Sequence, residues 1–276
     1  MLTNTFLHLR GIGKVREAEL WRKGYLTWDD LAKRDRLSQQ TADQLDLSSS
    51  RLASRDARHF ADALPPSDRW RVYPDFASDA AFLDIETTGL STDDSVVTLV
   101  GILDSSGYTA FVRGDNLDEL PATLSKYRLM VTFNGASFDL PFLRNVFGPE
   151  LDAQAGHIDL RHVLRRAGLP GSLKAIERRT GTGRPSVLAT LSGRDAVTLW
   201  QMSQEGEPGA LPTLIRYNAE DVASLPRLAQ LAIERLSEGT PLAAAQLPAI
   251  VHDRVSRLPY DKSLVKYLAA KSAYRR

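Results

Sequence analysis

Two carboxylates stand in an otherwise apolar segment, "AFLDIETTGL" at residues 81–90. The segment is predicted to be a short strand that ends at a Thr-Thr-Gly turn, so Asp84 and Glu86 point to the same face. Neighbouring carboxylates repel each other unless a proton or a cation lies between them. The alternative is a solvent-facing strand, with Phe82 on the same outer face, and the segment alone does not decide between the two.

Two later segments carry further acidic residues. In "VTFNGASFDLPFL" a predicted strand runs into an Asn-Gly pair, and a helix follows with Asp139 in its first turn. In "RYNAEDVASLPRLAQL" Tyr217 and Asp221 are four residues apart on a predicted helix and share one face. Each also has a structural explanation, because Asp139 can stabilise a helix N-terminus and the other two can form a solvated face.

Taken together, the four carboxylates of Asp84, Glu86, Asp139 and Asp221 predict a metal site. Ligand sets made only of oxygen suit hard divalent cations such as Mg²⁺ or Mn²⁺. Two such ions roughly 3.5–4 Å apart can stabilise the attacking and the leaving oxygen of a phosphodiester. This chemistry needs no cysteine, no serine nucleophile and no organic cofactor.

The elements that must position these residues are indicated by a change of pattern near residue 80. Strands are predicted at 81–86, 96–103, 108–113 and 128–134, and the turns between the first three favour antiparallel hairpins. Helices are predicted at 116–126, 137–148, 161–167, 172–180, 194–204 and 211–236. A strand, a helix and a further strand in succession predict an α/β fold whose sheet is mixed.

The chain is predicted to have three parts. Residues 1–75 are expected to form a helical module in which Thr27 caps a helix, and "LPPSDRW" at 64–70 is the best linker candidate. Residues 80–236 carry the motifs, and residues 237–276 form a basic tail. Residues 251–276 hold seven Lys/Arg and two Asp/Glu, so this end either contacts a polyanion or is simply a soluble terminus.

Composition excludes several classes of protein. The 276 residues are 43% hydrophobic and 25% charged, as in ordinary globular proteins. The absence of cysteine excludes disulfides, thiolate metal sites and cysteine nucleophiles, and it is compatible with a cytoplasmic location. No apolar run approaches the ~18 residues of a membrane helix, and the N-terminus lacks the features of a signal peptide. A cytoplasmic protein without a membrane partner is expected.

The three motifs together resemble those of the DEDD 3′–5′ exonuclease superfamily. Asp84-Ile-Glu-Thr-Thr-Gly is similar to the first motif, Asn134-Gly-x-x-Phe-Asp139 to the second, and Tyr217-x-x-x-Asp221 to the third. The resemblance covers residues 80 to 236. It implies a ribonuclease H-like fold: a mixed sheet flanked by helices, here preceded by the helical module.

The third motif has the tyrosine form of the superfamily, because the histidine form would need His where this chain has Arg216. The resemblance implies that Tyr217 orients the water activated by one of two Mg²⁺ or Mn²⁺ ions. The implied activity is 3′–5′ exonucleolytic hydrolysis, with single-stranded DNA ends favoured. RNA-directed or internal cleavage by the same site, and an inactive nucleic-acid-binding adaptor, are the alternatives. The wider sequence is similar to a bacterial group of predicted exonucleases.

Several neighbouring residues are candidates for substrate binding. Thr87 offers a backbone N–H to a terminal nucleotide or serves only a turn, and Asn134 contacts substrate or caps the following helix. Lys174 in "GSLKAIERR" is a candidate phosphate contact. His157 is better explained as a structural histidine than as a ligand.

Residues 9–33 resemble a helix-hairpin-helix motif, in which glycines let a phosphate approach backbone N–H groups. Gly11 and Gly13 would form the hairpin, with Lys14 beside it. Such motifs bind duplex DNA without reading its sequence. The alternative is a helical packing unit that never meets nucleic acid.

Overall fold

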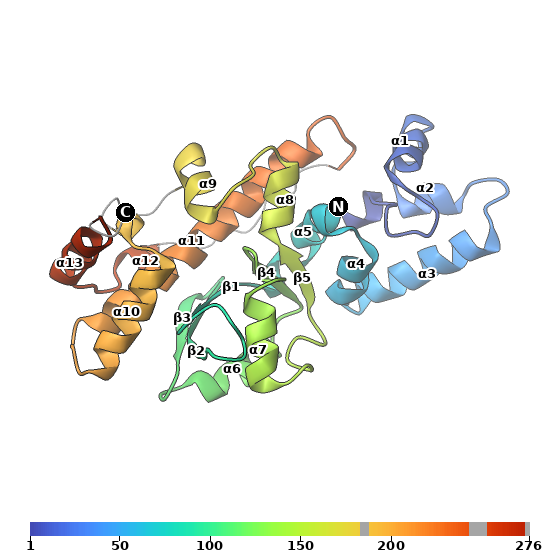
Figure 1. Ribbon diagram of the computed structural model, residues 1–276. Coiled ribbons are helices and arrows are strands. Elements are labelled where there is room, and N and C mark those ends of the chain that lie inside the picture. The colour runs from blue at the N-terminus through green and yellow to red at the C-terminus, as the bar shows by residue number, and fades with distance from the viewer. Residues whose placement is uncertain (183–187, 243–252, 274–276) are drawn as a thin grey trace.

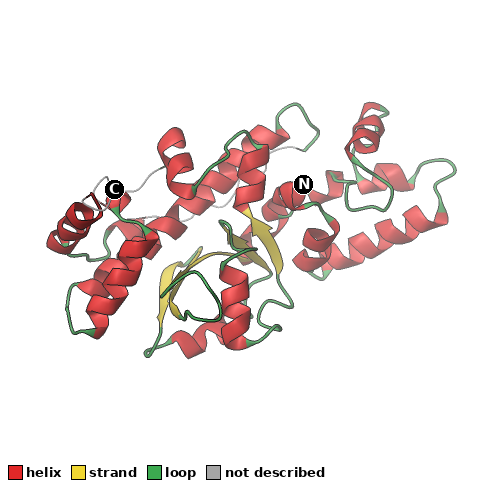
Figure 2. Ribbon diagram, viewed as in Figure 1, coloured by secondary structure: helices red, strands yellow, loops and turns green. Residues whose placement is uncertain are grey.

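The computed structural model describes residues 1–182, 188–242 and 253–273. In this part of the chain, helices flank one five-stranded sheet in the order β3-β2-β1-β4-β5, and the first helices of the chain lie to one side of it (Figures 1 and 2). Its strands are β1 (Ala80–Thr87), β2 (Val97–Asp104), β3 (Gly107–Val112), β4 (Leu129–Thr132) and β5 (Gly156–Asp159). The first three pair antiparallel, whereas β4 runs parallel to β1 and β5 parallel to β4. The predicted mixed sheet and its hairpins are confirmed.

The two faces of the sheet are covered by different helices. Leu83 and Ile85 of β1 belong to an apolar cluster with residues of α6 (Leu120–Leu124) and α7 (Asp139–Phe147). Phe82, on the other face, is fully buried in a cluster that includes α8 (Leu160–Arg166) and α11 (Ala210–Ser237). Since side chains alternate along a strand, Asp84 and Glu86 share the face of Phe82. The solvent-facing interpretation of this strand is therefore wrong.

The long helix α11 crosses the sheet and packs against β1 and β2. Its 28 residues are buried along most of their length, and it continues through Pro226. Three shorter helices follow the sheet or flank α11: α9 (Leu173–Thr180), α10 (Gly193–Gln204) and the one-turn α12 (Asp253–Ser256). All six helices predicted between residues 116 and 236 are present, with ends that differ from the prediction by a few residues.

The N-terminal part is helical, as predicted, and consists of α1 (Lys14–Arg22), α2 (Trp28–Ala32), α3 (Gln39–Ala53), α4 (Ala57–Ala63) and α5 (Tyr73–Phe76). Thr27 caps α2 in a reciprocal capping box with Asp30. Residues 64–70 do not form an open linker: Pro66–Arg71 is a 3₁₀ helix whose Trp70 is buried. The N-terminal helices share one apolar core with Phe82 and Val131 of the sheet. The division into domains stays a prediction.

The predicted basic tail is partly folded onto the body of the protein. Residues 243–252 and 274–276 lie outside the described residues, but α13 (Lys262–Ala273) buries Val265 and Leu268 against residues of β2, α10 and α11. Within the described ranges, no helix has both the length and the apolar character needed to cross a membrane.

Candidate active site

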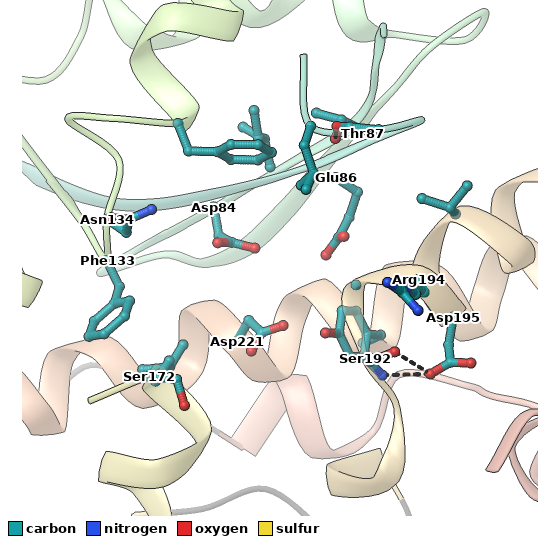
Figure 3. A pocket seen from close by; sticks show the side chains of 18 of the residues that line it. Asp84, Glu86, Thr87, Phe133, Asn134, Ser172, Ser192, Arg194, Asp195 and Asp221 are labelled. Carbon is teal, nitrogen blue, oxygen red and sulfur yellow. Dashed lines mark hydrogen bonds between the residues drawn. The ribbon is translucent and has the colours of Figure 1, made fainter. Parts of the chain in front are cut away.

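Three of the four predicted carboxylates meet between β1 and α11. Asp84, Glu86 and Asp221 each offer one oxygen, and these oxygens all lie within 4.8 Å of one another. Figure 3 shows Asp84 and Glu86 extending from the strand toward Asp221 on the facing helix. Glu86 and Asp221 are each 8% exposed, and Asp84 is half-buried. We call these three residues the acidic triad.

The local structure explains why the triad forms. Two-residue spacing on β1 places Asp84 and Glu86 on the face that α11 covers, and four-residue spacing on α11 places Asp221 one turn beyond Tyr217. Tyr217 is buried and lines the same cavity as the triad. Its hydroxyl oxygen accepts a hydrogen bond of 3.1 Å from Lys174 Nζ. The tyrosine is thus held at the edge of the acidic triad.

Asp139, the fourth predicted carboxylate, lies next to the triad but is not a member of it. It is the first residue of α7 and is 3% exposed. Burial raises the pKa of Asp139, and the charge of Asp159 raises it further, whereas the backbone N–H groups of Asp139 and Ile85 lower it. The charge of Asp139 in turn contributes to raising the pKa of Glu86. All four carboxylates are therefore close enough for their charges to interact. Three of them, the acidic triad, can coordinate one cation.

Glu86 has the most perturbed environment of the triad. Burial raises the pKa of Glu86, and the nearby charge of Asp221 raises it further. The Asn218 hydrogen bond and the Lys174 charge act in the opposite direction. A buried carboxylate whose pKa is raised by a neighbouring carboxylate is typical of functional sites and of sites for a cation. An all-oxygen donor set fits Mg²⁺ or Mn²⁺ better than softer ions, so the residues present fit the predicted metal.

Asn218, which the sequence did not single out, holds two members of the triad. This fully buried side chain donates from Nδ2 to Asp84 Oδ2 at 3.0 Å and to Glu86 Oε1 at 3.4 Å. Its Oδ1 accepts a bond of 2.9 Å from the hydroxyl of Tyr108 on β3. Gly101 lies opposite Asp84 on β2, and a Cβ there would be 1.8 Å from Asn218 Oδ1. The glycine therefore makes room for the asparagine.

A cavity of about 1380 Å³ opens over the triad. Four cationic residues from three helices line it: Arg161, Arg165, Arg194 and Lys271. Apolar lining comes from Leu90, Phe133 and Phe138, of which Leu90 is 88% exposed. The arrangement is an acidic floor beneath a partly basic, partly apolar wall, which suits a ligand that carries both negative charge and flat apolar groups.

Two predicted substrate-binding residues line this cavity. The Thr87 hydroxyl donates to the carbonyl of Gly89 at 2.5 Å and so supports the turn after β1. Asn134 has a left-handed backbone (φ 70°), and its side-chain oxygen accepts bonds from Ser137 and Arg161. Asn134 does not cap α7, whose N-cap is Phe138, so that interpretation is wrong. Substrate contact by Thr87 and Asn134 stays a prediction.

The loop that carries Asn134 is fixed by Asp159, a second residue whose role the sequence did not reveal. Its carboxylate accepts from the backbone N–H groups of Asn134 at 2.8 Å and Ala136 at 3.1 Å. The detectable signal was its place at the end of a strand, immediately before a helix.

His157, two residues earlier, contacts the Thr132 hydroxyl at 2.9 Å, and burial lowers the pKa of His157 to about 4. These contacts favour a structural role for His157 over a role as a metal ligand.

Lys174 contacts protein groups at the edge of the cavity. Besides the Tyr217 hydroxyl, its Nζ donates to the carbonyl of Leu191. It also lies 4.8 Å from the centre of the Tyr217 ring. Its predicted phosphate contact stays a prediction.

The hairpin-like residues of the N-terminal part do not line the cavity. Gly11 has a left-handed backbone (φ 79°), and Gly13 precedes α1. A Cβ on either glycine would meet no other atom within 4 Å, so packing does not require glycine there. Lys14 Nζ lies 3.3 Å from Asp68 Oδ2, which draws this ammonium toward the body of the protein. Nucleic-acid binding by these residues stays a prediction.

Comparisons with known proteins place the chain in a superfamily. A search of curated proteins gave no match. Among solved structures, a family B DNA polymerase from the hyperthermophilic archaeon Pyrobaculum calidifontis is similar, with 17% identity and a TM-score of 0.45. The similarity covers 60% of this chain and 27% of that one, so this chain corresponds to about a quarter of the polymerase. Residues 81–233, more than half of the chain, match the family model of the RNase_H superfamily, and the chain therefore belongs to that superfamily.

Proposed function

We propose that this protein is a metal-dependent 3′–5′ exonuclease that removes nucleoside monophosphates from single-stranded DNA ends. Membership of the RNase_H superfamily supports a nuclease-type function. The observation that carries the proposal is the acidic triad on the floor of a cavity with cationic walls. A phosphodiester backbone can be drawn in by the arginines and reach the carboxylates only if cations offset their charge.

The proposed ligands are Asp84, Glu86 and Asp221, with Asp139 beside them. Two bound Mg²⁺ or Mn²⁺ ions would supply Lewis-acid stabilisation of the attacking and leaving oxygens. Asn218 fixes the orientation of two of the carboxylates, which keeps the donor set ready for cations. Such support by a second layer of residues is the usual way that metal ligands are oriented.

Tyr217 is proposed to position the attacking water. Its place one helical turn before Asp221, on the cavity wall, supports this role. Lys174 is proposed to hold the tyrosine hydroxyl in place through the 3.1 Å hydrogen bond. Correct placement of a nucleophile within near-attack distance accounts for a large part of many enzymatic rates.

The test is digestion of 5′-labelled single strands of DNA and of RNA, with Mn²⁺, Mg²⁺ or EDTA. We expect a ladder of single-nucleotide steps on DNA with either metal and no products in EDTA. Asp221→Asn, which keeps the side-chain shape, should lower the rate about a thousandfold, since Lewis-acid stabilisation is worth several kcal/mol.

Other product patterns identify the alternatives. A few internal fragments would indicate an endonuclease, and cleavage of RNA alone would reassign the substrate. Strand binding in EDTA without hydrolysis under any metal would indicate a binding adaptor. Full activity of Asp221→Asn would contradict the metal assignment.

A further inference from the structure

The C-terminal segment that follows the family domain is anchored to the helix that carries the candidate catalytic residues. The family match ends at residue 233, while α12 and α13 lie at 253–273. Asp261, just before α13, donates its backbone N–H to Thr213 Oγ1 on α11 at 2.9 Å. Its side chain lies against Gly209, where a Cβ would be 2.8 Å from Asp261 Oδ2. These two contacts with α11 and its N-cap glycine fix the start of α13.

Arg216 is the second anchor, and it neighbours Tyr217 directly. Its guanidinium, 3% exposed as a residue, donates to the carbonyls of Ser256 at 3.1 Å and Leu258 at 2.7 Å. It also forms an ion pair with Glu220 at 2.6 Å. Because α11 presents Tyr217 to the cavity and Arg216 to the C-terminal segment, the position of that segment is coupled to the site.

The anchored helix α13 contributes to the cavity wall. Its buried Val265 and Leu268 belong to the same apolar cluster as Tyr217 and Leu99. Leu268 and, about one turn later, Lys271 line the cavity itself. Lys271 is exposed, and its ammonium lies 5.7 Å from the centre of the Tyr267 ring on the same helix. A cation outside the family domain thus faces the cavity of the acidic triad.

The charged residues of α13 are all positive: it carries Lys262, Lys266 and Lys271 and no acidic residue. Only Lys271 of these lysines lines the cavity. Its flexible ammonium is suited to bind a phosphate as a point charge rather than to fix a base. The other lining cations come from α8 and α10, so the cationic side chains surround the triad from separate helices.

We propose that α13 forms one wall of a nucleic-acid-binding cleft, and that Lys271 binds a backbone phosphate of the strand that enters it. This inference rests on the proposed function, because the ligand is the same nucleic acid. It assigns substrate binding to a segment beyond the family domain. Leu268 provides the fixed base of this wall, and Lys271 provides its charged contact.

The experiment measures binding of a short fluorescein-labelled oligo(dT) to the full chain in EDTA, by anisotropy, over a series of KCl concentrations. Lys271→Ala should weaken binding on the order of threefold and Lys271→Glu on the order of tenfold at low salt, the scale of an exposed ion pair and of its reversal. The slope of log Kd against log salt should fall by about 0.7 in Lys271→Ala, as for one lost phosphate contact to a single strand. Lys271→Arg should restore binding.

Lys266→Glu is the matched control, since it makes the same charge change at another exposed lysine of α13 that does not line the cavity. With Mn²⁺ and a series of strand concentrations, Lys271→Ala should raise KM and leave the kcat reached at saturation unchanged. Equal binding by Lys271→Glu and the unaltered chain would overturn the proposal, and so would equal losses in Lys266→Glu and Lys271→Glu. Absence of hydrolysis by the unaltered chain would instead contradict the proposed function, while the binding comparison would still decide the role of α13. A chain that binds no oligonucleotide in EDTA at any salt concentration would overturn the proposal for α13, whereas the proposed function is decided by the digestion with metal.

Discussion

Two sets of buried carboxylates in this protein have opposite surroundings. Under the N-terminal helices, Glu17 is 1% exposed and accepts two bonds from Arg71 at 2.8 and 2.9 Å. In the cavity, Glu86 is 8% exposed and lies among Asp84 and Asp221, with an amide as its hydrogen-bond donor. The first arrangement neutralises charge with the chain's own arginine. The second brings acidic groups together, which costs free energy unless a proton or a cation binds.

Among substitutions, the largest effect on folding is expected where the chain's own arginine neutralises the buried carboxylate. Glu17→Gln removes the carboxylate 2.8 Å from the buried Arg71 and leaves it with Asp68 at 3.7 Å, and removal of one partner of a buried ion pair is strongly destabilising. We expect the free energy of unfolding to fall by about 3 kcal/mol, measured by urea titration. The activity of the folded fraction should not change, because Glu17 is not among the residues that line the cavity.

The matched substitution in the cavity should not lower the free energy of unfolding. In EDTA, Asp221→Asn removes one of the charges that raise the pKa of Glu86, so the free energy of unfolding should rise or stay unchanged. A loss of stability as large as that of Glu17→Gln would show that the two sets of acids do not differ as the geometry indicates.

A smaller effect is expected for Asn218, which connects the triad to the sheet behind it. Asn218→Ala removes the hydrogen bonds to Asp84 and Glu86. Loss of such supporting partners typically lowers metal affinity about 10- to 100-fold, and calorimetric titration with Mn²⁺ measures it directly. Tyr108→Phe keeps Asn218 and removes only the hydroxyl bonded to its Oδ1, so it is the milder comparison. Unchanged Mn²⁺ affinity in Asn218→Ala would contradict a positioning role.

The stability of the folded chain should also depend on pH when no divalent metal is bound. The pKa of Glu86 is raised from 4.5 to about 8 in the fold, so the folded chain holds more protons than the unfolded chain within this interval. The free energy of unfolding should therefore fall as pH rises from about 5 to about 8 in EDTA. Thermal unfolding at several pH values measures this slope. Saturating Mn²⁺ should reduce or reverse it, and Glu86→Gln should flatten it; an unchanged slope in Glu86→Gln would assign the effect to other groups.

Periodicity and spacing predicted the parts of the site that depend on local geometry. Alternation along one strand placed Asp84 and Glu86 together, and a four-residue interval placed Tyr217 with Asp221. The helices and strands of residues 80–236 were predicted for the same reason, because each pattern is set by neighbours in the chain. The sheet order could not be read in this way, although the hairpin turns indicated its antiparallel half.

Contacts between distant residues could not be predicted. Tyr108 and Asn218 are 110 positions apart, and only strand register brings Gly101 beneath them. Lys14 was predicted to lie beside a nucleic-acid-binding hairpin, but a sequence does not show that the buried Asp68 lies next to it. Likewise, two prolines predicted a linker near residue 65, whereas the fold buries Trp70 there. Turn residues indicate where the chain changes direction, but they do not show whether other parts of the protein pack over the segment.

The shared core of the N-terminal helices and the sheet sets a fixed geometry between the two ends of the molecule. Phe60 and Trp70 belong to the same apolar cluster as Phe82 on β1, so the N-terminal helices cannot swing independently of the acidic triad. Any strand that touches both the Gly11 turn and the cavity must therefore span one constant distance. If both places bind nucleic acid, oligonucleotides shorter than that span would reach the cavity alone, and longer ones would contact both.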